Sequence, residues 1–308
     1  MIQKVNNLSS PRNSITLALA WVGTLLLSIL PNILFQESSG GVPSWLFGAK
    51  LTVIAVLLFL SLLWAPARTL QRYFLVFLVI LVADLLGTWL AGLPQWQAWF
   101  STEISDFVPY LLGDQLMRMI MAVIIILGLL LVGFRRGQFF LRPGELNAPA
   151  PPWPEVGVNK PSTWRPLGVR LSLLAFFVLL LVIGVFYAGR VTLEAVWAAA
   201  PLLPLILLFA GTNSFYEEIA YRAALLAPIH RVLGKTHSVL LTAAFFGIGH
   251  FYGVPYGLLG VAFSAFFGWI LARSMLETKG IFWPWLIHMI ADTVIFGFLA
   301  IGAVQLSG

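Results

Sequence analysis

The chain has 308 residues, of which 60% are hydrophobic and only 10% are charged. Ordinary soluble domains carry about 25% charged residues, so this composition excludes a soluble protein and indicates a polytopic membrane protein. The net charge of +6 is spread along the chain without a dense Lys/Arg cluster, which argues against nucleic-acid binding. The chain has no cysteine, which excludes disulfides, thiolate nucleophiles and cysteine-based metal sites.

Long apolar segments follow one another along the chain. A helix of roughly 20 apolar residues can span a bilayer, and nine such segments are predicted, so the expected fold class is an all-α polytopic transmembrane bundle of about nine helices. The first segment follows a stretch without a clear cleavage site and is expected to be a retained anchor. The predicted segments are 14–35, 45–64, 73–93, 116–134, 170–188, 198–227, 238–253, 256–275 and 282–303.

One polar stretch divides the chain. Residues 135–169 contain seven prolines, which forbid a regular helix. We expect a Pro-rich cytoplasmic linker here, between an N-terminal four-helix transmembrane part, 1–134, and a C-terminal five-helix part, 170–308. With the N-terminus inside, fourteen of the 18 Lys and Arg residues fall on the cytoplasmic side and three outside. This positive-inside bias predicts a multi-pass protein with a cytoplasmic N-terminus, which we expect in a bacterial plasma membrane.

Two adjacent glutamates, Glu217 and Glu218, lie inside the sixth apolar segment. A charged side chain at the bilayer centre costs about 2.5–3.5 kcal/mol on insertion scales, so such a residue indicates function. Arg222 is four residues after Glu218, on the same helix face, and can pair with it. Glu217 points roughly 100° away and has no partner nearby in the sequence, which makes it a candidate general base.

Later segments carry three more polar residues. His250 lies in the seventh segment, while His288 and Asp292 are four residues apart in the ninth and share a helix face. Glu217 and His250 are sixteen or seventeen residues from the centre of a polar turn near 233–234. In an antiparallel helical hairpin the two side chains would therefore lie at the same depth, which predicts one common site.

These residue types suit peptide hydrolysis. Glu217 and His250 could hold and deprotonate a water, while His288 and Asp292 could stabilise the oxyanion or protonate the leaving amine. Alternatively, Glu217, His250 and His288 form a His₂Glu set of the kind that binds zinc in hydrolases. The spacing differs from the common H-E-x-x-H pattern, so no cofactor is favoured and zinc is the alternative.

Three short motifs carry these residues. Residues 217–222 read E-E-x-x-x-R, residues 246–250 read F-x-x-x-H, and residues 288–292 read H-x-x-x-D. With the motifs in this order on separate helices, residues 170–308 resemble the CPBP (Abi, type II CAAX-protease-like) intramembrane proteases. The resemblance identifies this C-terminal part as the catalytic domain.

The resemblance implies an intramembrane endopeptidase that acts on a membrane-associated protein or peptide, with the lipid bilayer as its surroundings. A glutamate mechanism is favoured, and a metalloprotease is the alternative. Asp292 stands where eukaryotic-type CAAX proteases usually have Asn. The implied site consists of the water-activating pair Glu217 and His250, the transition-state-binding pair His288 and Asp292, and the supporting pair Glu218 and Arg222.

Two other function classes fit the same residues. A proton-coupled transporter could use buried carboxylates and histidines, but such carriers often contain repeated halves, and the sequence has no visible repeat. A member of the same family that binds a membrane partner without cutting it is the second alternative. The intact set of motif residues favours the protease over both.

Other polar and aromatic residues have simpler explanations. Asp84, Asp114 and Arg118 lie near predicted helix ends or in outer loops, so we expect them to be structural or interfacial. Tryptophan gathers at the two interfaces of a membrane. The tryptophans expected to form such belts are Trp45, Trp64, Trp89, Trp153, Trp283 and Trp285.

Overall fold

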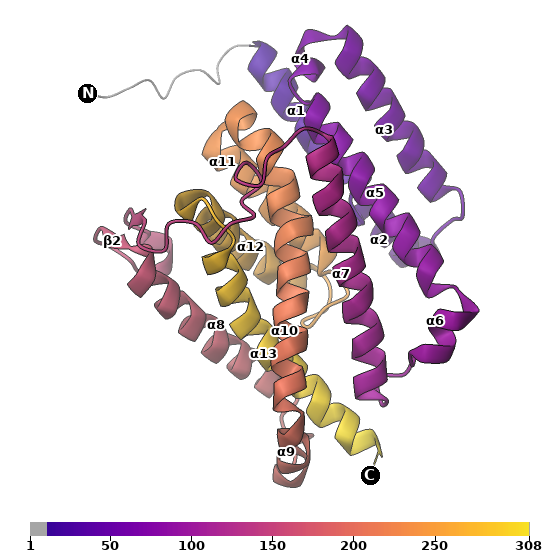
Figure 1. The fold of residues 1–308 in the computed structure, drawn as a ribbon, viewed down its shortest axis with the longest axis vertical. Coiled ribbons are helices and arrows are strands. Elements are labelled where there is room, and N and C mark those ends of the chain that lie inside the picture. Colours follow the sequence, from indigo (N-terminus) through magenta and orange to yellow (C-terminus); the bar gives the residue numbers. More distant parts are fainter. Residues whose placement is uncertain (1–10, 308) are drawn as a thin grey trace.

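A computed structural model describes residues 11–307, and within this range the chain is a bundle of helices with one very short pair of strands (Figure 1). Seven helical stretches are long and apolar enough to cross a membrane, or eight if one bent pair counts as a single span. The predicted all-α polytopic bundle is confirmed, and the chain is an integral multi-pass membrane protein. Lys4, one of the residues in the charge count, lies outside the described residues.

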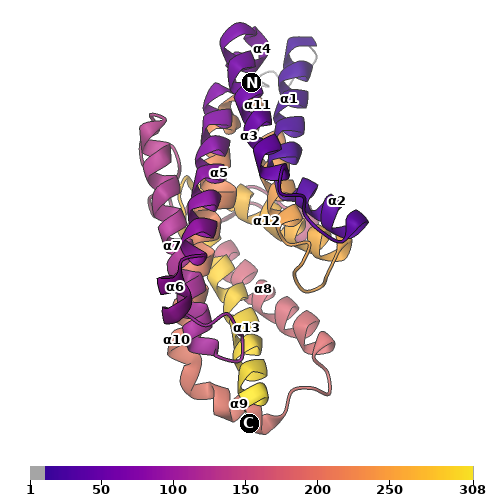
Figure 2. The same cartoon turned by 90° about the vertical axis from the view of Figure 1, so that its right-hand side faces the viewer.

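The N-terminal helices form one side of the bundle, where α3 and α5 pack together and α5 packs on α7 (Figure 2). The first predicted segment is a bent pair, α1 and α2, which meet at 50°. Lys50 stabilises the bend because its Nζ donates to Ser28 O at 2.7 Å and to Asn32 Oδ1 at 2.6 Å. The helices are α1 (Pro11–Leu27), α2 (Leu30–Ser39), α3 (Leu46–Leu63), α4 (Ala65–Arg68), α5 (Gln71–Ala91), α6 (Pro94–Trp99) and α7 (Phe107–Leu131).

Helix α7 begins at Phe107, nine residues before the predicted start at 116. Pro109 lies in its first turn, where the missing N–H of proline is not needed for a helical hydrogen bond. The longer helix includes Asp114 and Arg118, which the sequence places in or beside an outer loop. Gly128 lets α7 approach α5 closely, since a Cβ at this position would be 2.3 Å from Val79 Cγ1.

The predicted linker is packed against the C-terminal helices. It contains β1 (Pro149–Ala150) paired antiparallel with β2 (Ser162–Thr163), and a 3₁₀ turn η1 (Pro154–Val156). Arg142 joins the linker to the turn between α12 (Leu258–Thr278) and α13 (Phe282–Ser307). The Nε of Arg142 donates to Lys279 O at 2.8 Å, and the Arg142 carbonyl accepts from Ile281 N at 2.9 Å.

The expectation of an interfacial belt is wrong for Trp153 and Trp283, which are both buried. The Arg273 guanidinium lies 3.8 Å from the centre of the Trp153 ring, within cation–π range. Trp283 Nε1 donates to Leu146 O at 3.0 Å. These two tryptophans therefore attach the linker to the helices beneath it.

The sixth and seventh predicted segments lie in one 57-residue helical run, Leu193–Gly249. The run is interrupted at Gly234, whose φ of 75° and ψ of 171° are not helical, and this is the position of the predicted turn. The elements are α8 (Trp164–Phe186), α9 (Leu193–Ala199), η2 (Ala200–Leu202), α10 (Leu203–Glu217), η3 (Glu218–Ala223), α11 (Ala224–Gly249), α12 (Leu258–Thr278) and α13 (Phe282–Ser307).

Helix α10 packs on both α7 and α13, and Figure 2 shows it at one edge of the bundle beside α7. Helices α11 and α12 pack on each other, and α8 packs on α13. Helix α1 begins near one end of the long axis, whereas α13 ends at the other. The C-terminal end of α10 is nevertheless buried, and α7, α11 and α13 can all contribute side chains there.

Candidate active site

A π-helical turn, η3, follows directly after Glu217. Such turns are rare and occur frequently at functional sites. Within this turn Arg222 Nη1 donates to Glu218 Oε1 at 2.6 Å, and both side chains are completely buried. The Arg222 guanidinium also lies 4.0 Å from the centre of the Phe246 ring. The predicted pairing of Glu218 with Arg222 is confirmed.

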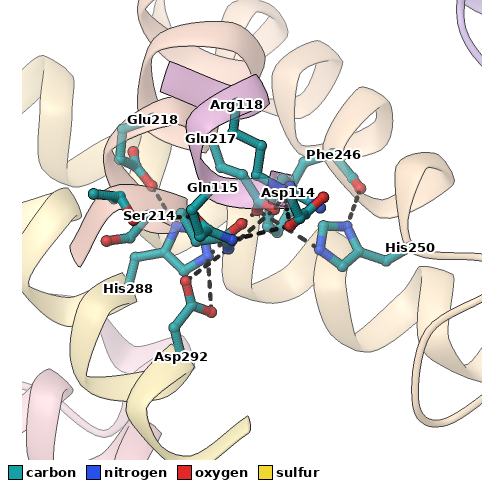
Figure 3. Close-up of polar contacts among 12 residues, drawn as sticks. Asp114, Gln115, Arg118, Ser214, Glu217, Glu218, Phe246, His250, His288 and Asp292 are labelled. Atoms are coloured by element: carbon teal, nitrogen blue, oxygen red, sulfur yellow. Dashed lines mark hydrogen bonds and ion pairs between the residues drawn. The ribbon is translucent and has the colours of Figure 1, made fainter. Parts of the chain in front are cut away.

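The two carboxylate oxygens of Glu217 have different surroundings (Figure 3). Oε1 accepts from Arg118 Nη1 and from Asn213 Nδ2, each at 3.3 Å. Oε2 is 3.5 Å from His288 Nε2 and 3.8 Å from His250 Nε2, and it accepts no hydrogen bond from the described residues. Glu217 therefore has one donor that is distant in sequence, Arg118, and one that is four residues before it, Asn213, so the expectation that it has no partner nearby in the sequence is wrong.

Hydrogen bonds fix the orientation of both imidazole rings. His250 Nδ1 is 2.8 Å from the Phe246 carbonyl oxygen, and His288 Nδ1 is 2.8 Å from Glu218 Oε1. A carbonyl accepts but cannot donate, and the Glu218 carboxylate already accepts from Arg222, so each Nδ1 carries the proton. In the neutral rings both Nε2 atoms therefore present a lone pair towards Glu217.

Asp292 completes the cluster from α13. Its Oδ2 accepts from Asn213 Nδ2 at 2.9 Å, and its Oδ1 is 3.6 Å from His288 Nε2. The amide of Asn213 consequently bridges Asp292 and Glu217. Asn213 was not predicted, although it is four residues before Glu217 and so shares its helix face.

The structure brings the predicted residues Glu217, His250, His288 and Asp292 into one cluster. Three of them are almost completely buried, with side-chain exposures of 9% for Glu217, 4% for His288 and 5% for Asp292. His250 is 31% exposed and Arg118 is 32% exposed. Arg118 and His250 are therefore the partly exposed members of the cluster.

The predicted supporting pair reaches this cluster through His288. Glu218 Oε1 accepts from Arg222 and from His288 Nδ1, and no direct hydrogen bond joins the pair to Glu217. Arg222 thus holds Glu218, and Glu218 holds the ring of His288. The orientation of His288 towards Glu217 depends on both.

Polar side chains of α7 form a second layer beside the site (Figure 3). Asp114 Oδ2 accepts from Arg118 Nε at 2.8 Å and from Gln115 Nε2 at 3.0 Å. Gln115 Oε1 in turn accepts from Thr212 Oγ1 at 3.0 Å. The prediction that Asp114 and Arg118 lie near helix ends or in outer loops is therefore wrong, since both lie inside α7 and Arg118 contacts Glu217. Their spacing of four residues in an apolar helix was the signal that could have indicated them.

The alternative prediction for this cluster is a zinc site formed by Glu217, His250 and His288. Between residues 11 and 307, no group of three or more His, Asp or Glu side chains has an arrangement that could hold a metal ion. Zinc stays an alternative prediction, and the mechanism below contains no step at a metal.

The motif residues all lie within one recognisable segment. Residues 198–294 match the family model for Type II CAAX prenyl endopeptidase Rce1-like proteins. This segment is similar to that family. It extends from α9 into α13 and covers less than half of the chain, so that α7 with Arg118 lies outside the Rce1-like match. No curated protein and no solved structure matches the chain.

Proposed function

We propose that this protein is an intramembrane endopeptidase, which hydrolyses a peptide bond of a membrane-associated protein or peptide with a water activated by Glu217 and His250. One observation carries the proposal: the free Oε2 of Glu217 faces the Nε2 atoms of His250 and His288 in a buried cluster. Glu217 Oε2 and His250 Nε2 are two acceptors in close proximity, which favours a shared proton donor such as a water between them. The Rce1-like match over 198–294 supports a protease.

The first step is the attack of water on the scissile carbonyl. Glu217 Oε2 and His250 Nε2 are 3.8 Å apart, close enough for one water to donate a hydrogen bond to each. A lone pair of the water oxygen then attacks the carbonyl carbon. As the new C–O bond forms, Glu217 takes a proton from the water, and the carbonyl oxygen becomes an oxyanion.

The oxyanion needs a hydrogen-bond donor, and His288 is suitably placed. Its Nδ1 proton is engaged by Glu218, so in the protonated ring Nε2–H remains available to the oxyanion. The carboxylates of Glu218 and Asp292 lie on either side of this ring and balance its charge. When the C–N bond breaks, the proton on Glu217 passes to the leaving nitrogen, giving a carboxylic acid and an amine.

The substrate class follows from the surroundings of the site. The cluster is formed by long apolar helices, so a substrate has to approach within or beside the bilayer. The family description specifies a CAAX prenyl endopeptidase. We therefore take a farnesylated peptide with a Cys-aliphatic-aliphatic-X end as the first substrate to test.

The test uses purified protein reconstituted in liposomes with an internally quenched farnesylated peptide. Glu217→Gln should lower kcat by about 10²–10⁴-fold, the range for loss of a general base. Glu145→Gln is the control, since Glu145 is exposed on the linker and pairs with Lys279 away from the site. If the peptide is not cut, membranes from cells expressing wild-type or Glu217→Gln protein are compared for a fragment that only the wild type produces. Full activity of Glu217→Gln would refute the proposal.

Treatment with a chelator distinguishes the glutamate mechanism from a zinc-dependent mechanism. The glutamate mechanism predicts that cleavage persists after exhaustive treatment with a chelator, with metal content measured in parallel. Loss of activity that stoichiometric zinc restores would instead assign Glu217, His250 and His288 as metal ligands.

A further inference from the structure

Helix α7 belongs to the N-terminal part of the chain, yet it places a cation against the candidate base. Arg118 Nη1 is 3.3 Å from Glu217 Oε1, and residues 198–294, which carry the family match, do not include α7. We propose that Arg118 is a positioning residue for Glu217, so that the N-terminal helices complete the catalytic site. This inference rests on the proposed function.

The guanidinium of Arg118 is held in a defined orientation. Its Nε donates to Asp114 Oδ2 at 2.8 Å, one turn earlier on α7, and Gln115 holds the same carboxylate oxygen. The guanidinium carbon lies 5.6 Å from the centre of the Tyr216 ring. Because the donors of arginine form a rigid planar fork, fixing Nε also fixes the direction of Nη1. Arg118 can therefore hold the carboxylate of Glu217 as well as neutralise it.

The hydrogen bonds to Oε1 of Glu217 determine the direction in which Oε2 points. The terminal torsion of a glutamate side chain is broad, so an unrestrained carboxylate rotates readily. Arg118 and Asn213 both donate to Oε1, which leaves Oε2 directed at His250 and His288. Without Arg118, one neutral amide donor would remain on Oε1. Arg118 thus acts through Glu217, and no contact with the reacting atoms is required of it.

A purely structural role explains Arg118 less well. Its side chain is 32% exposed and that of Asp114 is 36% exposed, so neither is enclosed on all sides by the packing of the bundle. Arg222 is the opposite case, because its pair with Glu218 is completely buried. The chain therefore has two arginines beside adjacent glutamates, and only the pair of Arg222 with Glu218 is completely enclosed.

The experiment measures kcat and KM for Arg118→Gln, Arg118→Lys and Arg118→Ala in liposomes. The probe is the farnesylated quenched peptide, or the substrate peptide found in the membrane comparison if the first is not cut. A small displacement of a catalytic group can cost about 100-fold, so we expect Arg118→Gln to lower kcat by about 10- to 100-fold with KM within about threefold. Arg118→Lys should retain intermediate activity, and added guanidinium should partly restore Arg118→Ala.

Arg72→Gln is the matched control, because Arg72 also lies over an aromatic ring, that of Phe134 at 5.5 Å, but is remote from the site. It should leave kcat unchanged. The positioning role is overturned if Arg118→Gln has wild-type kcat, if only KM rises, or if a lower melting temperature accompanies the loss and guanidinium rescues nothing. In each of these cases, an inactive Glu217→Gln variant would still support the proposed protease function. An active Glu217→Gln variant would refute both the protease function and the role of Arg118.

Discussion

Replacing Arg222 by Met tests the buried ion pair at the centre of the C-terminal helices. The substitution keeps an extended apolar side chain against Phe246 but removes the cation that contacts Glu218 at 2.6 Å. Glu218 would then be a buried carboxylate with His288 as its remaining hydrogen-bond donor. We expect a large loss of stability, because the charge cannot reach water.

The expected size follows from the complete burial of both side chains. Removing one partner of a buried ion pair costs about 3–5 kcal/mol, chiefly because the other charge is left uncompensated. Glu218→Gln alone should be costly for the same reason, since Arg222 would then be unpaired. The double variant Glu218→Gln/Arg222→Met contains neither charge, so its cost should not exceed that of either single variant.

The assay is reversible unfolding by SDS in mixed micelles. It gives the free energy of unfolding of the wild type, of each single variant and of the double variant, which together form a double-mutant cycle. Glu145→Gln serves as the control, since its exposed pair with Lys279 should not measurably affect unfolding. Independent sites add within about 0.5 kcal/mol. If the double variant costs the sum of the two single variants within that margin, the two side chains are not coupled and the reasoning fails.

Three further predictions concern packing, the site and topology. Gly168→Ala should destabilise the protein by about 1–3 kcal/mol, because its Cβ would be 2.2 Å from Trp283. Gly184→Ala, in the same helix, meets open space and should not change the stability. Equal unfolding midpoints of the two variants would contradict this prediction. Asn213→Ala removes the amide that bridges Glu217 and Asp292, so in the liposome assay it should lower kcat more than it raises KM. An unchanged kcat would argue against a role of this bridge. Reporter fusions after residue 150 and at the C-terminal end should report opposite sides of the membrane, and the same side would exclude the predicted orientation.

The helices could be predicted well because they depend on local composition. Each predicted apolar segment falls on a helix, and the equal depth of Glu217 and His250 followed from counting residues on either side of Gly234. The early start of α7 could not be predicted from hydropathy, because Asp114 and Arg118 break the apolar pattern. Their charges are tolerated inside the helix since each has a partner.

The contacts of the site depend on packing between distant parts of the chain. Nothing local to Glu217 indicates Arg118, which is 99 residues away and meets it only because α7 packs on α10. The burial of Trp153 could not be predicted for the same reason, because the ring packs on Arg273 of α12, which is distant in sequence. Asn213 is the exception: its spacing from Glu217 was visible, but an amide in an apolar helix was not by itself a reason to include it.

The π-helical turn at Glu218–Ala223 restricts which changes of length the chain can tolerate. A π turn contains one residue more than the α-helix it interrupts. Deleting a residue here would turn everything that follows by about 100° relative to α10, and His250 would leave the side of Glu217. The exposed loop 187–192 between α8 and α9 has no such constraint. Natural variants should therefore gain or lose residues in that loop, while the count from Glu217 to His250 stays constant.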